Sequence, residues 1–197
     1  NQRLKKCIQN YVHIVLECCF RRAGRLLNWV QIFERARIAG GFPISSLNNS
    51  RGTTMTTISL ETALGITRQA LAVGRELSTA PLTIAVLDAG GHLVALQRED
   101  GASMLRPQIA IGKAWGAVAL GKSSRLLAAD AQQRPSFISA VNTLAHGNLV
   151  PAPGGVLIRN DKAEVVGAVG ISGDTSDIDE QCAIQGVLAV GLVPDAG

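Results

Sequence analysis

The stretch VLDAGGHLVALQREDG, residues 86–101, decides the fold. An apolar run over residues 82–88 meets the turn AGG, and residues 92–99 then alternate between apolar and polar positions, which predicts a β-hairpin. The stretch GVLIRNDKAEVVGAVGIS (155–172) predicts a second hairpin that turns at its Asn-Asp dipeptide. A segment with helical spacing follows each hairpin. Two strand-turn-strand-helix units predict an α+β fold, in which helices pack on an antiparallel sheet.

Three segments carry the main helical signals. Residues 106–121 predict a helix with Pro107 in its first turn, and residues 173–191 predict a closing helix that begins with several acids. Ahead of the first hairpin, residues 58–77 predict a helix capped by Ser59. Its expected apolar stripe comprises Leu60, Leu64, Ile66, Thr67, Ala70, Leu71 and Leu77.

The composition changes sharply near Met55. Residues 1–54 hold nine Lys or Arg against two Glu, a net charge of +7, whereas residues 55–197 hold ten basic and thirteen acidic residues, a net charge of −3. We therefore divide the chain into a basic N-terminal extension (1–54) and a domain (55–197), and we interpret the extension as the product of a misplaced start upstream of Met55. The alternative is a genuine basic amphipathic arm that binds a partner or an anionic surface.

The domain lacks the features of several function classes. Trp115 and Phe137 are its only aromatic residues, which argues against a stacking platform for nucleic acid. No apolar run reaches the roughly 18 residues needed to cross a membrane. The stretch VHIVLECCF (12–20) resembles a signal peptide, but His13 and Glu17 interrupt it and no cleavage site follows. We therefore expect a cytoplasmic protein without nucleic acid or membrane partners; a secreted form is the alternative.

The sequence also lacks the cysteine and nucleophile motifs that would indicate a metal site, a disulfide framework or a hydrolase. No Cys-x-x-Cys pair occurs, so neither a zinc site nor a disulfide framework is predicted, and Cys182 is interpreted as a small buried residue. Neither a Gly-x-Ser-x-Gly nor a Walker sequence is present. Nucleophilic catalysis therefore finds little support, and the residues alone indicate a small α+β domain with one polar-rimmed pocket or interface; whether it is an enzyme stays open, with a binding protein favoured.

Two histidines are candidate ligands for iron. His92 follows the double glycine of the first hairpin turn, where it could bind iron or carry protons, or simply be an exposed residue at the start of a strand. His146 could be an axial ligand, or a cation at the end of a helix.

Three charged residues are candidate ligands for an acid. Arg98 and Asp100 leave the second strand together; the arginine could hold a carboxylate or propionate, or the pair could be a solvated surface feature. Lys113 lies in an apolar helix, where it could line a site for an anionic group or extend to water.

Two glycine-containing loops complete the candidates. Gly154 and Gly155 allow close approach of the backbone to a ligand or a neighbouring chain, or form only a stiff turn. Ser172 precedes the closing helix, whose free N–H groups could hold an anion, although Asp179 and the acids around it would repel one. Capping by Asp174 or Ser176 and metal binding by the acids are the other interpretations.

Taken in order, IAVLDAGGHLVALQREDGA, IAIGKAWGAVALG, the PGGV turn and EVVGAVGISGDTSDIDEQCA resemble the GlcG/HbpS-like family, which includes the C-terminal domain of the PduO corrinoid adenosyltransferases. The resemblance covers residues 55–197. It implies a five-stranded antiparallel sheet flanked by helices and assembly into a higher homo-oligomer. Packing between subunits would then account for the many Ala and Gly residues. The implied function is binding of heme or a related small ligand.

The resemblance also implies a set of site residues. Heme-binding members can use a histidine in the first helix, and residues 58–77 hold none. We therefore keep three hypotheses. The first is a heme-binding protein with His92 or His146 as axial ligand. The second is an enzyme or accessory subunit that acts on a small organic acid in a catabolic pathway, with Arg98 or Lys113 holding the acid, and the third is an oligomer without a ligand. The family's recurrent polar positions fall on Asp88, His92, Arg98, Asp100, Lys113, Gly154, Gly155, Ser172 and Asp179.

Overall fold

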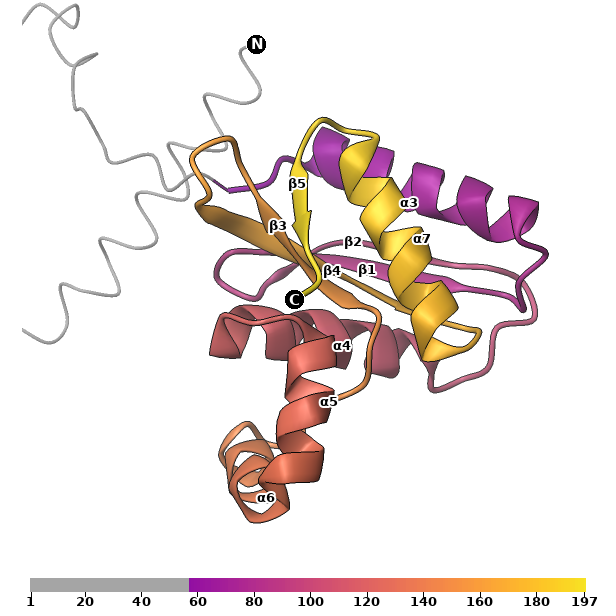
Figure 1. Cartoon of the computed structure of the whole chain (residues 1–197). Coiled ribbons are helices and arrows are strands. Elements are labelled where there is room, and N and C mark those ends of the chain that lie inside the picture. The colour runs from indigo at the N-terminus through magenta and orange to yellow at the C-terminus, as the bar shows by residue number, and fades with distance from the viewer. Residues whose placement is uncertain (1–56) are drawn as a thin grey trace, which may run out of the picture. The chain divides into compact units, whose positions relative to one another are not determined.

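The computed structural model describes residues 57–197, which form an antiparallel sheet of five strands with helices on both faces (Figure 1). The strand order is β2-β1-β4-β3-β5. The strands are β1 (Thr83–Asp88), β2 (Leu93–Arg98), β3 (Gly155–Arg159), β4 (Val165–Ser172) and β5 (Val193–Asp195). The helices are α3 (Leu60–Glu76), α4 (Arg106–Leu120), α5 (Ser124–Gln133), α6 (Pro135–Leu144) and α7 (Ser176–Leu188). The predicted α+β class and five-stranded sheet are confirmed.

Both predicted hairpins form, and they share a central pair of strands. β1 pairs with β2 and β3 with β4, and the two hairpins join because β1 also pairs with β4. The fifth strand, β5, pairs with β3 at the other edge of the sheet. No local pattern predicted β5, because three residues are too few to show an alternation and the partner strand provides the pairing.

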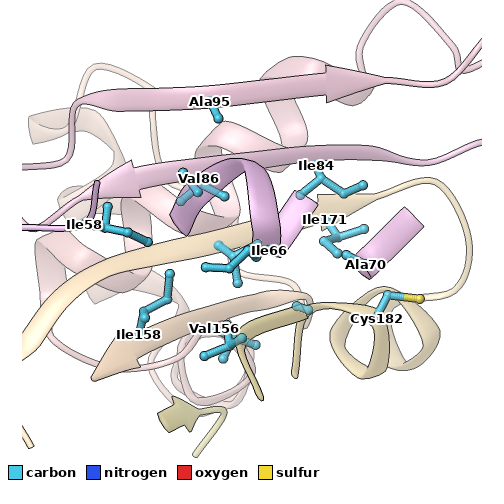
Figure 2. Close-up of a cluster of buried hydrophobic side chains, with 14 of the residues drawn as sticks. Ile58, Ile66, Ala70, Ile84, Val86, Ala95, Val156, Ile158, Ile171 and Cys182 are labelled. Atoms are coloured by element: carbon cyan, nitrogen blue, oxygen red, sulfur yellow. The ribbon is translucent and has the colours of Figure 1, made fainter. Parts of the chain in front are cut away.

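Helices α3 and α7 cover one face of the sheet with large aliphatic side chains. Figure 2 shows Ile66 of α3 among Ile84 and Val86 of β1 and Ile171 of β4, all buried. The thiol of Cys182 on α7 is also buried, and burial raises its pKa to about 11, which fits its interpretation as a core residue.

The start of α3 was predicted correctly, and its apolar stripe is buried or partly buried except at its two ends. The Ser59 side chain accepts a hydrogen bond from the Thr62 N–H at 3.1 Å and caps the helix. Leu60 and Leu77, at the two ends of the expected stripe, are exposed.

Helix α4 covers the opposite face through small residues. Ala110, Ala114 and Ala117 pack on Ala85, Leu87, Leu157 and Ala168 of the strands. A Cβ on Gly170 would collide with the Ala110 carbonyl oxygen, so the backbone of α4 lies directly on β4. The resemblance had suggested that Ala and Gly serve contacts between subunits. In α4 they instead pack against the chain's own sheet.

The connection from α4 to β3 forms a smaller helical unit. Helices α5 and α6 project away from the sheet beneath α4 (Figure 1). Leu127, Ile138 and Leu149 make a separate small core there. Within residues 57–197, no helix has the length and hydropathy of a membrane span. The proposed boundary at Met55 and the extension 1–54 lie outside the described residues.

Candidate functional site

The turn of the first hairpin holds an imidazole beside a carboxylate. Asp88 ends β1, and its Oδ1 accepts hydrogen bonds from the N–H groups of Gly90 at 2.9 Å and His92 at 2.8 Å. The Nδ1 atom of His92 lies 3.3 Å from both carboxylate oxygens of Asp88. The His92 side chain is 82% exposed and that of Asp88 26%. The Nε2 atom of His92 therefore faces away from the carboxylate that orients the ring.

The Asp88 carboxylate is held in its charged form. Partial burial opposes ionisation, but hydrogen bonds from the backbone N–H groups of His92 and Gly90 outweigh it and lower the pKa of Asp88 below 3.8. An ionised Asp88 favours an Nδ1–H tautomer of His92, which leaves Nε2 with a free lone pair.

Apolar side chains surround this turn. The indole Nε1 of Trp115, on α4, lies 3.3 Å from the point where a Cβ of Gly91 would be. Leu93 and Leu96 are exposed on β2, which is an edge strand. In the sequence, Trp115 stands out only as one of two aromatic residues of the domain. Trp115 follows Ile111 by four residues and precedes Val118 by three, which places the three side chains on one side of α4. This spacing could have predicted an apolar surface next to the turn.

A buried ion pair lies at the other end of the sheet. Lys113 Nζ donates hydrogen bonds to Asp179 Oδ2 and to the Ile171 carbonyl, both at 2.8 Å. The two side chains are 3% and 1% exposed. Burial lowers the pKa of Lys113 and raises that of Asp179, and the attraction between the two charges opposes both shifts. Lys113 thus neither extends to water nor offers its charge to an anion.

The two glycines of the PGG turn fit around this pair. Gly154 has a φ of 110°, and a Cβ there would lie 2.9 Å from Lys113 Nζ and 3.0 Å from Asp179 Cβ. The N–H of Gly155 donates to Ser124 Oγ at 2.6 Å. The close backbone approach predicted for this turn is made to α4 and α5 of the same chain.

Ser172 and the start of α7 are occupied by internal hydrogen bonds. Arg106 Nη1 donates to Ser172 Oγ at 3.1 Å. The N–H of Asp174 donates to Asp179 Oδ1 at 3.1 Å, and Asp174 Oδ2 accepts from the Ala80 N–H at 2.8 Å. Arg106 was missed, although its position seven residues before Lys113 places both on one side of α4.

The predicted cap of α7 is wrong. Thr175 is the N-cap residue, and no side chain caps the helix, because the Asp174 carboxylate is used by the preceding loop. Of the other acids, Asp177 and Glu180 both pair with Arg125 of α5. Among residues 57–197, no group of three or more His, Cys, Asp or Glu side chains could hold a metal ion.

Arg98 and Asp100 line a separate cavity of about 530 Å³ near the end of α3. Glu99 Oε2 accepts a hydrogen bond from the Leu82 N–H at 2.8 Å, and Glu99 Oε1 lies 3.8 Å from Arg75 Nη2. The remaining wall consists of Gly74, Thr79 and Pro81. Arg75 and Glu99 were not predicted as site residues.

His146 lies apart from all these groups. It follows α6, has a φ of 53° and is exposed. Its backbone N–H donates to the Thr143 carbonyl. Its side chain forms no hydrogen bond or ion pair with the described part of the chain.

The predicted site residues therefore fall into separate groups. Asp88 and His92 lie at one end of the β1–β2 hairpin, and Arg98 and Asp100 lie at the other. At about 3.3 Å per residue, the six residues of β2 separate these groups by roughly 20 Å. Lys113, Gly154, Gly155, Ser172 and Asp179 form an interior cluster.

Solved structures share this fold. The heme complex of PduOC is 24% identical with a TM-score of 0.64, covering 71% of this chain and 99% of that one. The ORFY protein of Klebsiella pneumoniae is 25% identical with a TM-score of 0.65, covering 74% of this chain and 98% of that one. A double mutant of Streptomyces reticuli HbpS is 25% identical with a TM-score of 0.60, covering 76% of this chain and 97% of that one.

No curated protein matches the sequence. The family model described as "Haem degrading protein HbpS-like" matches residues 58–188, which is more than half of the 197-residue chain. The matched range begins just before α3 and ends with α7, and so contains both hairpins and the groups of site residues described above. The chain belongs to the HbpS-like family.

Proposed function

We propose that this protein binds heme in a homo-oligomer, with His92 as an iron ligand. The observation that carries the proposal is the pairing of the exposed His92 ring with Asp88 through Nδ1. Histidines that bind metals commonly donate their second ring N–H to a carboxylate, which fixes the ring and makes Nε2 a better ligand.

The surroundings of His92 fit a porphyrin. Imidazole nitrogen is an established axial ligand of heme iron. Trp115, Leu93 and Leu96 offer apolar contact close to the turn, and a porphyrin ring needs such contact because its faces are largely apolar. Bound heme would supply a redox-active iron, which Asp88 would influence through His92.

A second copy of the chain would complete this site. The His92 side chain is 82% exposed, so the described part of one chain leaves most of the ring uncovered. Among residues 57–197, strand β2 pairs on one side alone and carries exposed leucines, a combination that favours association with another chain. The heme complex of the similar PduOC protein and the family description support the choice of ligand.

The test is a titration of the full chain with hemin, followed by absorbance and by size-exclusion chromatography. We expect a saturable Soret band that elutes with an oligomer. His92→Ala should remove or shift the band, and Asp88→Asn should weaken binding by about tenfold through loss of the charge that orients the ring.

His146→Ala is the matched control, because it also removes an exposed histidine but one without a carboxylate partner in the described residues. It should leave the titration unchanged. A spectrum altered only by His146→Ala would overturn the assignment of His92. A spectrum altered by neither variant would exclude ligation by these histidines, and a linear, non-saturating titration would contradict heme binding itself.

A further inference from the structure

We propose that the cavity lined by Arg98 and Asp100 is a second binding site, for a small zwitterion of the amino-acid type. It lies at the opposite end of β2 from His92, so it is independent of the heme proposal. The cavity volume of about 530 Å³ falls in the range of roughly 300–1,000 Å³ typical of small-molecule sites.

The cavity is lined by charges of both signs, and some of these groups have hydrogen-bond or ion-pair partners while others have none among the described residues. The side chains of Arg98 and Asp100 form no hydrogen bond or ion pair with the described residues. Glu99, by contrast, is held by the Leu82 N–H, and Arg75 approaches Glu99 only to 3.8 Å. A cation and an anion two residues apart are thus available to a ligand, while Glu99 keeps the chain between them in place.

This arrangement selects a class of ligand. The planar guanidinium of Arg98 can receive a carboxylate through two parallel N–H donors. The Asp100 carboxylate can accept hydrogen bonds from an ammonium group. A ligand with one charge only would leave the opposite charge of the protein unpaired, so a molecule that carries both is favoured.

The polarity of the wall sets the expected affinity. Both free charges are exposed in the structure, and exposed ion pairs contribute little because water competes for each partner. We therefore expect dissociation constants in the millimolar range, which correspond to about −4 kcal/mol.

The experiment uses the full chain labelled with ¹⁵N and the twenty standard amino acids as probes, followed by NMR. At least one should shift the amide resonances of residues 98–101 saturably below about 20 mM. Its α-hydroxy analogue and its analogue lacking the carboxylate should each bind about two- to fivefold more weakly, because each loses one exposed charged contact. If no amino acid shifts these resonances, the proposal is wrong.

Variants distinguish a site from unspecific charge effects. Arg98→Gln and Asp100→Asn should each weaken binding of the same amino acid by about two- to fivefold. Arg68→Gln removes an exposed arginine on another part of α3 and should leave binding unchanged. Equal binding by Arg98→Gln, Asp100→Asn and the unmodified protein would overturn the proposal even if resonances shift. Loss of hemin binding in His92→Ala should not affect the amino-acid titration, so the two proposals can fail separately.

Discussion

The two faces of the sheet are packed by different means, although the same strands supply both. In β4, Ile171 points to the face covered by α3 and α7, and its neighbour Gly170 points to α4. The α3/α7 face gains its stability by burying large aliphatic side chains. The α4 face has little room for side chains and brings the backbone of a helix directly onto a strand.

The buried ion pair joins helices from the two faces of the sheet. Lys113 of α4 reaches the Ile171 carbonyl and Asp179 of α7, so the ammonium group replaces its lost hydration with protein acceptors. The α3/α7 face should therefore tolerate loss of buried volume poorly. The α4 face should tolerate added volume poorly, and the ion pair should not tolerate loss of either charged partner.

The largest effect should come from breaking the ion pair between Lys113 of α4 and Asp179 of α7. Lys113→Met leaves Asp179 buried without its cation, and we expect the free energy of unfolding to fall by about 3–5 kcal/mol, measured by urea denaturation. Adding Asp179→Leu should recover part of the loss, because the second charge is removed as well. A double variant as unstable as the sum of both single variants would show that the pair acts through separate contacts.

Neighbouring residues of β4 test the two faces directly. Ile171→Ala should cost about 2–5 kcal/mol through loss of buried volume. Gly170→Ala should cost about 1–3 kcal/mol for the opposite reason, since the added Cβ meets the Ala110 carbonyl oxygen and α4 must move. Denaturation curves of both variants give these values. A neutral Gly170→Ala would mean that α4 is not held against the sheet as closely as described.

A smaller effect, dependent on pH, is expected at the hairpin turn outside both cores. The pKa of Asp88 is lowered in the folded chain, so its charge contributes stability above the unfolded value of 3.8, and this contribution disappears as the pH falls through the folded pKa. Asp88→Asn keeps an acceptor oxygen but loses the charge. The free energy of unfolding should fall by about 1 kcal/mol at pH 6, and the loss should shrink as the pH falls through the folded pKa of Asp88.

The matched measurement is the pH dependence of unfolding for Asp88→Asn and Ile171→Ala, each compared with the unmodified chain. The loss in free energy of unfolding caused by Ile171→Ala should change little over this pH range, because no titrating group is removed. If the loss in free energy of unfolding caused by Asp88→Asn grows towards low pH, the assigned direction of the pKa shift is contradicted.

Local features of the sequence determined much of this protein. Period-two alternation and glycine turns predicted both hairpins, and helical spacing with Ser59 and Pro107 predicted the starts of α3 and α4. The turn also singled out His92, whereas Asp88 was selected only through the resemblance to the GlcG/HbpS-like family. These signals are readable from sequence since each arises between residues only a few positions apart.

The tertiary structure alone decided the partners of the remaining residues. Lys113 and Asp179 are 66 positions apart, and neither shows locally that it will be buried against the other. The same holds for β5, for the exposed ends of α3 and for the separation of His92 from Arg98 at opposite ends of β2. Burial and pairing over such distances depend on which elements meet across the sheet, and the periodicity of a segment does not specify the element that covers it.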